Sequence, residues 1–250
     1  MSSENPKNVT IVIPAYNEEK TIAVVLEKLC ALEYVQQIIV VDDASADKTG
    51  EVVQNFKDER ILYLRHEKNA GKTAALRTGF QSIEGEIMIV QDADLEYDPD
   101  EIIYLMEPIW ENKADVVYGS RFMTRKASRV LYFYHYLANK SLTFFSNLFT
   151  NKNMTDVETC YKAFRSFIIK DMPIKSSGFG FEIEVTANVS KTKARVFETP
   201  ISYYGRTYEE GKKITMKDGF AALWYILRFN LNSGSKVKKY IQSVNSQLPF

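Results

Sequence analysis

Three carboxylates at alternate positions follow an apolar run near the middle of the chain. Asp92, Asp94 and Glu96 come after Ile87 to Val90, in the stretch GEIMIVQDADLEYDPDE. If the chain stays extended there, alternate side chains point to one side and the three carboxylates converge. Hard oxygen ligands suit Mg²⁺ or Mn²⁺, which share their coordination with substrate phosphates. The stretch therefore predicts a divalent-metal site, and the alternative is a solvated acidic turn.

The other acids that follow this run are predicted to start a helix. Pro99 suits the first position of a helix, and acidic side chains cap that end. We assign three residues to this structural role: Asp98, Asp100 and Glu101.

A second motif, NAGKTAAL, resembles half of a phosphate-binding loop. Gly71, Lys72 and Thr73 match its end, but the full loop needs a glycine five positions before Gly71, where this chain has His66. A nucleotide-binding ATPase or regulatory domain is therefore the alternative function from another class. A lysine at the start of a helix can also contact a diphosphate or an acid without such a loop.

Strand-like and helix-like periods alternate in the first half of the chain. Apolar runs predict strands at 9–14, 37–45, 60–67, 86–90 and 114–122, and helical spacing predicts helices at 18–32, 47–56 and 73–82. This alternation predicts an α/β fold with a mostly parallel central sheet flanked by helices. The polar clusters follow the carboxyl ends of the strands, which is the edge where such sheets bind ligands. In the second half, 158–169 and 179–191 have a mixed strand and helix pattern, and 194–206 predicts a strand.

The composition fits one domain that is soluble or peripherally attached to a membrane. The 250 residues include 32 basic and 32 acidic side chains, so the whole molecule is not a polyanion binder, and we expect no nucleic-acid partner. Cys30 and Cys160 match no disulfide or metal framework, which indicates a reducing, cytoplasmic compartment. The first ten residues lack an apolar signal region, and the apolar run 220–227 is far shorter than the roughly 20 residues of a membrane span.

Bases and aromatic residues gather between positions 121 and 155, where there are no acids. Apolar side chains recur there at helical spacing, as in an amphipathic helix at a membrane interface: Leu142, Phe145 and Leu148 or Phe149. The alternative is an ordinary amphipathic helix packed on the core. The later string GFAALWYILRFN, followed by KVKK, is a second candidate for docking on a membrane surface or a partner.

Five strings occur in the order and spacing seen in family 2 glycosyltransferases: VTIVIPAYNEE, IIVVDDASADKT, NAGKTAALRTGF, IMIVQDADLEYDPDEI and ADVVYGSRF. Three further strings extend the likeness to its polyprenyl-phosphate (dolichol-phosphate) mannosyl- and glucosyltransferase branch: TDVETCYKAFR, GFGFEIE and ISYYGRTYEEGKKITMKDGFAALWYIL. The chain thus resembles that branch, which implies a GT-A fold, a nucleotide-sugar donor and a divalent metal. The likeness divides the domain into a nucleotide-sugar half (1–122), an acceptor half (123–230) and a basic tail (231–250).

The resemblance also implies roles for individual residues. It assigns the nucleotide to Pro14, Ala15, Tyr16, Glu18, Asp43, Lys72 and Asp92, and the metal and diphosphate to Asp92 and Asp94. Glu96 is the third metal candidate, from the alternate spacing alone. Relatives often carry glutamine at the position of Glu96. The extra carboxylate favours metal binding but leaves fewer groups to read the sugar.

The expected reaction moves a hexose, with inversion, from a UDP- or GDP-sugar to a polyprenyl phosphate. Because a phosphate monoester has a second pKa of about 6, this acceptor is already anionic and a cationic pocket matters more than a base. The catalytic candidates are Asp94, Arg121 and Arg206, and the acceptor-phosphate candidates are Arg129 and Lys213. The alternative acceptor is a saccharide hydroxyl, which calls for a carboxylate base. The candidates for that base are Asp156, Glu182 and Glu184, the last two on one face of an expected strand, where one could order an arginine instead. Oligomeric state is left open.

Overall fold

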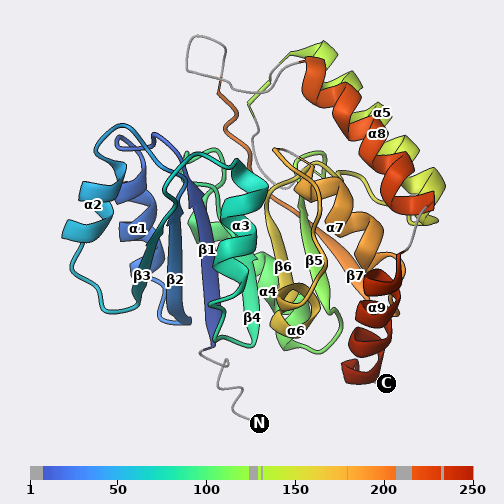
Figure 1. Ribbon diagram of the computed structural model, residues 1–250, viewed down its shortest axis with the longest axis horizontal. Helices are drawn as coiled ribbons and strands as arrows, with labels where there is room; N and C mark the ends of the chain where they lie inside the picture. The colour runs from blue at the N-terminus through green and yellow to red at the C-terminus, as the bar shows by residue number, and fades with distance from the viewer. Residues whose placement is uncertain are drawn as a thin grey trace.

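Apolar strand residues build a seven-stranded sheet at the centre of the molecule (Figure 1). The computed structural model describes residues 8–123, 129–130, 132–178, 180–206, 216–231 and 234–249. The strands are β1 Val9–Ala15, β2 Val35–Asp42, β3 Ile61–Arg65, β4 Ile87–Val90, β5 Val116–Ser120, β6 Lys162–Arg165 and β7 Val196–Pro200. Their order across the sheet is β3-β2-β1-β4-β6-β5-β7.

One reversed strand joins two parallel groups. Strands β3, β2, β1 and β4 are parallel to one another, and β5 is parallel to β7. Strand β6 lies antiparallel between β4 and β5, with Lys162 paired to Val90. The reversed strand therefore begins at the edge where β4 ends, and the residues just before β6 face those just after β4.

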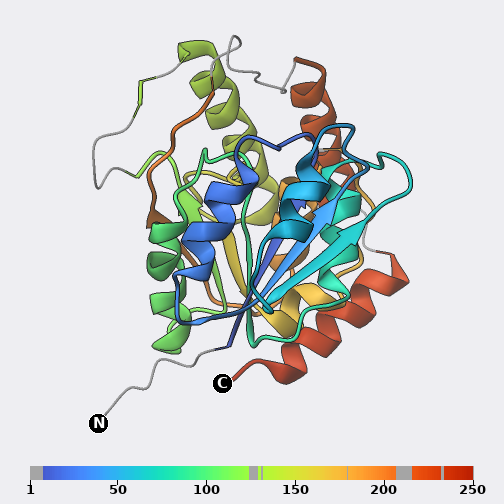
Figure 2. The same cartoon turned by 90° about the vertical axis from the view of Figure 1, so that its left-hand side faces the viewer.

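Helices cover both faces of the sheet (Figure 2). They are α1 Ile22–Cys30, α2 Thr49–Asn55, α3 Lys72–Phe80, α4 Ile102–Trp110, α5 Phe133–Thr150, α6 Ser166–Lys170, α7 Phe181–Val189, α8 Met216–Leu231 and α9 Ser235–Gln247, with a 3₁₀ turn, η1, at Pro99–Glu101. One apolar core lies under α1, α2 and α4, and a second lies under α3, α6, α7 and α9. The predicted α/β fold with a mostly parallel, helix-flanked sheet is confirmed.

Two predictions for the second half of the chain are wrong. Residues 181–189 form helix α7, so Glu182 and Glu184 do not share a strand face. Every residue of α7 is buried, and the alternation of Phe181 and Ile183 with glutamates came from full burial rather than from a pleat. The expected strand 194–206 ends at Pro200, and residues 201–206 continue beyond the sheet without strand pairing.

The acids that start α4 divide into two kinds. The Asp98 carboxylate accepts the Asp100 backbone N–H at 3.2 Å, and Lys28 binds both of these aspartates. This confirms the predicted cap. Glu101 is instead buried, and its carboxylate accepts the backbone N–H and the hydroxyl of Ser202. It therefore ties the start of α4 to the chain that follows β7.

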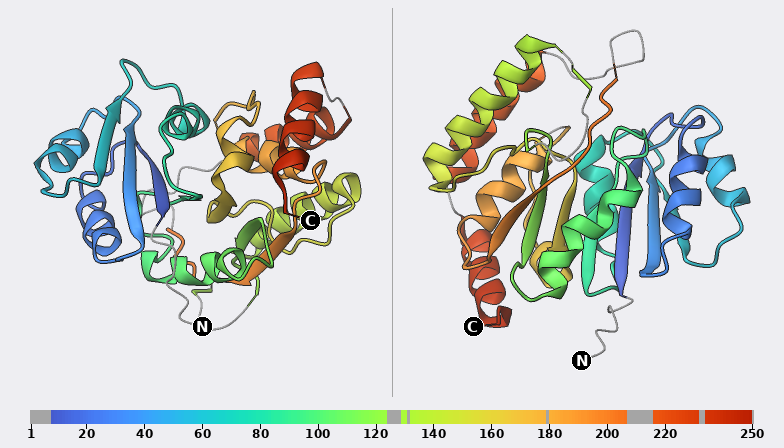
Figure 3. Two further views of the ribbon diagram at one scale, coloured as in Figure 1. Left: turned by 90° about the horizontal axis from the view of Figure 1, so that it is seen from below. Right: turned by 180° about the vertical axis from the view of Figure 1, so that it is seen from behind.

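Helices α5 and α8 lie side by side and stand away from the sheet (Figure 3). Of the predicted apolar stripe on α5, Leu142 packs against the core, whereas Phe145, Leu148 and Phe149 are exposed. Within the described residues, no helix has the length and apolar character needed to cross a membrane.

Asp115 offers a test of the buried ion pairs that hold the sheet, because it lies just before β5, at the edge away from the acidic cluster. Its carboxylate binds Arg165 at 3.1 Å and Arg195 at 2.8 Å and is 1% exposed. Burial raises the pKa of Asp115, but hydrogen bonds from Arg195 outweigh it and the net pKa is lowered. We expect Asp115→Asn to lower the free energy of unfolding at pH 7 by about 2 kcal/mol.

The sign of this effect with pH follows from the lowered pKa. The stabilisation is fully present above the ordinary aspartate pKa of about 3.9 and is lost as the pH falls below it. Urea unfolding of both proteins between pH 7 and pH 3 should therefore give stability curves that converge at low pH. A constant difference at every pH would contradict the assignment.

Candidate active site

A lysine and an aspartate meet at the carboxyl edge of the sheet. Lys72 begins α3 and Asp92 follows β4, and their Nζ and Oδ1 atoms are 2.7 Å apart. The reversed strand β6 brings Cys160 to the same place, where its Sγ lies 2.9 Å from the lysine. Burial lowers the pKa of Lys72, but Asp92, Cys160 and Glu182 raise it, and the net pKa is well above the usual value. Lys72 is therefore a permanent cation beside the predicted metal motif.

Asp94 faces a different base. Its Oδ2 is 2.5 Å from Nη2 of Arg206, which also lies 3.2 Å from Glu18. Burial, followed by the charges of Asp92 and Glu96, raises the pKa of Asp94 to about 6 even though Arg206 opposes the shift. Arg206 also lies 3.7 Å from Glu96, so one guanidinium faces three carboxylates in this part of the site.

The expected convergence of Asp92, Asp94 and Glu96 is wrong. The chain turns after β4 instead of staying extended, and Leu95 has a left-handed φ of 61°. Across the described ranges, no group of three Asp, Glu, His or Cys side chains is arranged to hold an ion. A metal here would need ligands from outside the protein as well.

The Glu96 carboxylate binds protein rather than facing the other acids. Oε1 accepts the backbone N–H of Arg206 and Oε2 accepts the Tyr203 hydroxyl, each at 2.9 Å. The Glu96 backbone carbonyl also accepts the N–H of Tyr204. Glu96 thus fixes the segment 203–206, and so determines where Arg206 lies.

Arg121 and Asp156 form a two-pronged ion pair beyond β5. Nε donates to Oδ2 at 2.7 Å and Nη2 to Oδ1 at 2.8 Å, while the Arg121 backbone N–H also reaches Oδ2. Asp156 is fully buried, and the guanidinium lies over the Tyr203 ring at 5.2 Å. Asp156 is therefore the partner of an arginine, and segment 203–206 contacts both Arg121 and Asp94.

The two glutamates of α7 have different surroundings. Glu184 accepts the backbone N–H groups of Lys175 and Ser176 at 2.8 and 2.6 Å, which is a structural role. Glu182 is also buried, yet neither carboxylate oxygen has a hydrogen-bond partner among the described residues. Its nearest cation is Lys72, at 3.6 Å. Of the two, Glu182 alone brings its charge to the edge of the site.

The residues predicted to bind the nucleotide lie at the ends of β1 and β2. Pro14 and Ala15 end β1, Tyr16 is exposed, and Glu18 is buried beside Arg206. Asp43 follows β2 and is hydrogen-bonded to the Ala15 carbonyl through its own N–H. The structure thus gathers these positions at one edge of the sheet, beside Asp94.

The Asp43 carboxylate accepts hydrogen bonds from the backbone N–H groups that would bind phosphate in a phosphate-binding loop. It accepts the N–H groups of Ala70 and Gly71, and it pairs with His66 Nδ1 at 2.6 Å. Gly71 has a φ of 88°, a conformation that side chains disfavour, and this lets the chain turn into α3. These backbone N–H groups are therefore not available to bind phosphate, which argues against the ATPase interpretation.

The acceptor candidates are placed only in part. Arg129 is exposed and donates to the Gly205 carbonyl at 3.1 Å, next to Arg206. Lys213 lies outside the described residues. Sequence reasoning missed Tyr203 and Glu198, although the string ISYYGR had marked the region of the first. It also missed Glu158, whose pKa is raised to about 7 by burial and then by Glu182.

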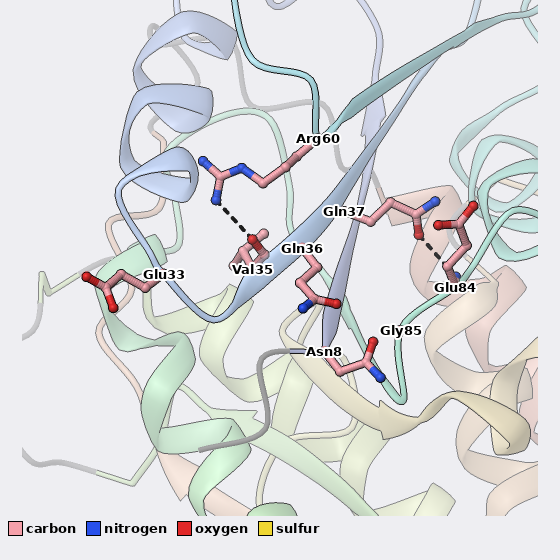
Figure 4. Close-up of a pocket in the computed structure, with 8 residues that line it drawn as sticks. All are labelled: Asn8, Glu33, Val35, Gln36, Gln37, Arg60, Glu84 and Gly85. Atoms are coloured by element: carbon pink, nitrogen blue, oxygen red, sulfur yellow. Dashed lines mark hydrogen bonds between the residues drawn. The ribbon is translucent and has the colours of Figure 1, made fainter. Parts of the chain in front are cut away.

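A separate pocket of about 390 Å³ opens at the opposite edge of the sheet (Figure 4). It is lined by Asn8, Glu33, Val35, Gln36, Gln37, Arg60, Glu84 and Gly85. The polar groups of Arg60 and Gln37 are bound to the protein, for example to the Val35 carbonyl and the Glu84 N–H. Because it contains none of the predicted site residues, and its Arg60 and Gln37 side chains are already bound to the protein, we do not regard it as the active site.

The role of Glu96 is testable without an activity assay. We expect Glu96→Ala to speed hydrogen exchange at the Arg206 amide by roughly tenfold or more, since one hydrogen bond to a charged group is lost. Exchange can be followed by mass spectrometry of peptides covering 196–206. Asp100→Ala is the matched control, because that carboxylate is exposed and its ion pair is with Lys28. Equal exchange in wild type and Glu96→Ala would contradict the role.

Comparisons with known proteins bear on the fold and the family. Undecaprenyl-phosphate 4-deoxy-4-formamido-L-arabinose transferase of Photorhabdus laumondii subsp. laumondii is 30% identical over 224 residues, covering 87% of this chain and 66% of the relative. UDP-N-acetylglucosamine–dolichyl-phosphate N-acetylglucosaminyltransferase of Methanococcus voltae is 26% identical over 244 residues, covering 90% and 97%. This chain therefore spans just under two thirds of the first relative and nearly all of the second.

The fold has a counterpart among solved structures. Glucosyl-3-phosphoglycerate synthase from Mycobacterium tuberculosis, in complex with uridine diphosphate, has a TM-score of 0.71 and 17% identity, covering 91% of this chain and 82% of that one. The predicted GT-A fold is confirmed by this likeness. The family described as glycosyl transferase family 2 matches residues 10–172, more than half of the chain. The chain therefore belongs to glycosyl transferase family 2.

Proposed function

We propose that the protein transfers a hexose, with inversion, from a UDP- or GDP-sugar to a polyprenyl phosphate. The main support for the proposal is that segment 203–206 contacts two charged groups, one acidic and one basic. Asp94 lies on one side of this segment, bound to Arg206, and Arg121 lies on the other, against Tyr203. An acidic group suited to a metal–diphosphate donor thus adjoins a basic group suited to a second phosphate.

The donor side fits a divalent ion held mainly through Asp94, with Asp92 nearby. Mg²⁺ in such sites is usually bound by one or two carboxylates together with substrate phosphates, so a cage of three carboxylates is not required. Three carboxylates, those of Asp94, Glu18 and Glu96, share the one guanidinium of Arg206, and this excess of acid suits a cation. Structures of the Mycobacterium tuberculosis synthase contain Mn²⁺ with uridine diphosphate, which supports the same cofactor class here. Such an ion supplies Lewis-acid stabilisation of the departing diphosphate.

The protein's own residues complete the donor side. Lys72 places a permanent positive charge beside Asp92, within reach of a diphosphate bound at the motif. The exposed Tyr16 offers a ring at the end of β1 against which a nucleotide base can pack. Glu96 affects the donor side only indirectly, because it fixes the position of Arg206 beside Asp94.

The acceptor side favours a phosphate over a hydroxyl. A phosphate oxygen attacks as an anion, whereas a hydroxyl needs a base within hydrogen-bond reach. Asp156 and Glu184 are both committed to protein hydrogen bonds, and neither is free to act as that base. The names of the two relatives include undecaprenyl phosphate and dolichyl phosphate, which supports a lipid phosphate. Glu182 keeps the saccharide alternative open, because its carboxylate has no hydrogen-bond partner in the described structure.

The metal assignment predicts a large loss of turnover in Asp94→Asn. Removing this charge should lower kcat by about 10²-fold or more, as when one electrostatic group of a transition state is lost. The donor can first be identified by thermal shift with UDP-, GDP- and dTDP-sugars in the presence of Mn²⁺. Asp98→Asn is the control, since that carboxylate caps the turn η1 and binds Lys28. Full activity in Asp94→Asn would refute the assignment of the metal to Asp94.

A separate assay tests the acceptor. Transfer to soluble saccharides but never to farnesyl phosphate would refute the proposed phosphate acceptor.

An apolar surface on α5 and α8 supports docking on the cytoplasmic face of a membrane. Phe144 and Leu148 on α5 are one turn apart and exposed, and α8 exposes an apolar row at helical spacing: Phe220, Trp224, Leu227 and Leu231. Leu148 is 66% exposed and Trp224 60%. Helix α5 contains no acidic residue, and Lys140 contacts the Phe122 ring, next to Arg121. Such a surface, continuous with the acceptor side, suits a lipid bilayer that carries the acceptor.

We expect Leu148→Ser with Trp224→Ser to weaken binding to phosphatidylglycerol-containing vesicles by about tenfold, because burial of large apolar side chains is lost. Co-sedimentation measures this. Val24→Ser is the matched control, because Val24 is an exposed apolar residue on α1, remote from this surface. Dimerisation that the double variant abolishes, with no vesicle binding by the wild type, would instead assign the surface to a second copy of the chain.

A further inference from the structure

The Glu198 carboxylate, on β7, accepts several hydrogen bonds from the loop that contains Asp156. It accepts the Thr155 backbone N–H at 2.9 Å, the Thr155 hydroxyl at 3.0 Å and the Asp156 backbone N–H at 3.2 Å. A single carboxylate therefore binds three donors from two consecutive residues. This is the arrangement in which a charged acceptor is most effective, because each bond is charge-assisted.

Asp156 in turn binds Arg121. Its two carboxylate oxygens hold Nε and Nη2 of the guanidinium, and its Oδ2 also accepts the Arg121 backbone N–H. The pair is almost entirely buried, with 0% of the aspartate and 12% of the arginine side chain exposed. Because a two-pronged pair fixes the plane of the guanidinium, a displaced Asp156 backbone would rotate the remaining N–H groups of Arg121.

Other elements hold the same loop from its remaining sides. The Ser120 hydroxyl, at the end of β5, is 2.7 Å from the Thr155 hydroxyl. Lys140 of α5 donates to the Thr155 carbonyl at 3.2 Å. Of these contacts, that of Glu198 alone reaches the Asp156 backbone, so Glu198 is the group best placed to control the aspartate.

We propose that Glu198 is a positioning residue for Arg121, and that through Thr155 and Asp156 it sets the orientation in which Arg121 binds the acceptor phosphate. This inference rests on the proposed function, in which Arg121 binds that phosphate. Glu198 does not touch Arg121, so its effect is indirect. A glutamine at this position would keep one acceptor oxygen but turn an NH₂ group toward backbone N–H donors.

The test measures binding of farnesyl phosphate by calorimetry, with inorganic phosphate as a headgroup-only ligand. Glu198→Gln should weaken farnesyl phosphate binding by about tenfold, the loss expected when one charge-assisted hydrogen bond is disturbed. The same substitution in an Arg121→Gln background should cause no further loss, because its effect passes through the arginine. Binding of the UDP- or GDP-sugar should stay within about twofold of wild type in the single variant.

Two more variants separate positioning from stability. Asp115→Asn disrupts another buried carboxylate–arginine network, at the opposite edge of the sheet, and should lower stability without changing phosphate binding. Thr155→Ala removes one of the Glu198 hydrogen bonds and should weaken binding in the same direction but less, which keeps the test valid if Glu198→Gln folds poorly.

The outcomes distinguish this inference from the proposed function. A wild type that binds neither farnesyl phosphate nor inorganic phosphate overturns the phosphate acceptor and the inference together. Binding that is lost in Arg121→Gln but unchanged in Glu198→Gln overturns the positioning role alone. An equal loss in Asp115→Asn, or an undiminished Glu198→Gln effect in the Arg121→Gln background, also overturns it, because the effect would then be one of general stability.

Discussion

Charges withdrawn from water at the carboxyl edge of the sheet must be matched by opposite charges, and this requirement organises the site. Asp94 is only 19% exposed and has two other acids close by in the sequence, so it needs a cation. Arg206 supplies that cation from more than a hundred residues further along the chain. The segment that follows β7 is therefore drawn across the edge of the sheet, where Glu96 and Tyr203 hold it in place.

The strand order makes this crossing possible. Strand β6 runs against its neighbours, so Cys160 enters beside the end of β4 while β5 and β7 still point to the same edge as β4. Helices and strands from both halves of the chain then contribute to one group of side chains. Lys72 and Arg121 come from the first half and Arg206 from the second, and none of them is close in sequence to the others.

The sequence predicted the first five strands well because buried parallel strands are continuous apolar runs that end in polar clusters. It failed at α7, where complete burial removes the polar face that reveals a helix, and Phe181, Glu182 and Ile183 resemble a strand. The site was predictable at the level of residue type. Resemblance to a family identified Lys72 and the arginines, but no pattern shows which acid binds which base. The roles of Glu96 and Glu198 follow from chain segments that meet only in three dimensions.

The contact between Arg206 and Asp94 makes cation binding an exchange rather than a simple addition. An ion that ligates Asp94 Oδ2 must replace a guanidinium 2.5 Å away, so the free energy of that ion pair is subtracted from the affinity for the ion. The released arginine keeps its charge, because the ordinary pKa of a guanidinium lies far above neutral pH. Loading the donor side would thus leave Arg206 with Glu18 and Glu96 as its remaining acidic neighbours. The donor side and the acceptor side would in this way be linked through segment 203–206, which carries Arg206 and contacts Arg121 through Tyr203.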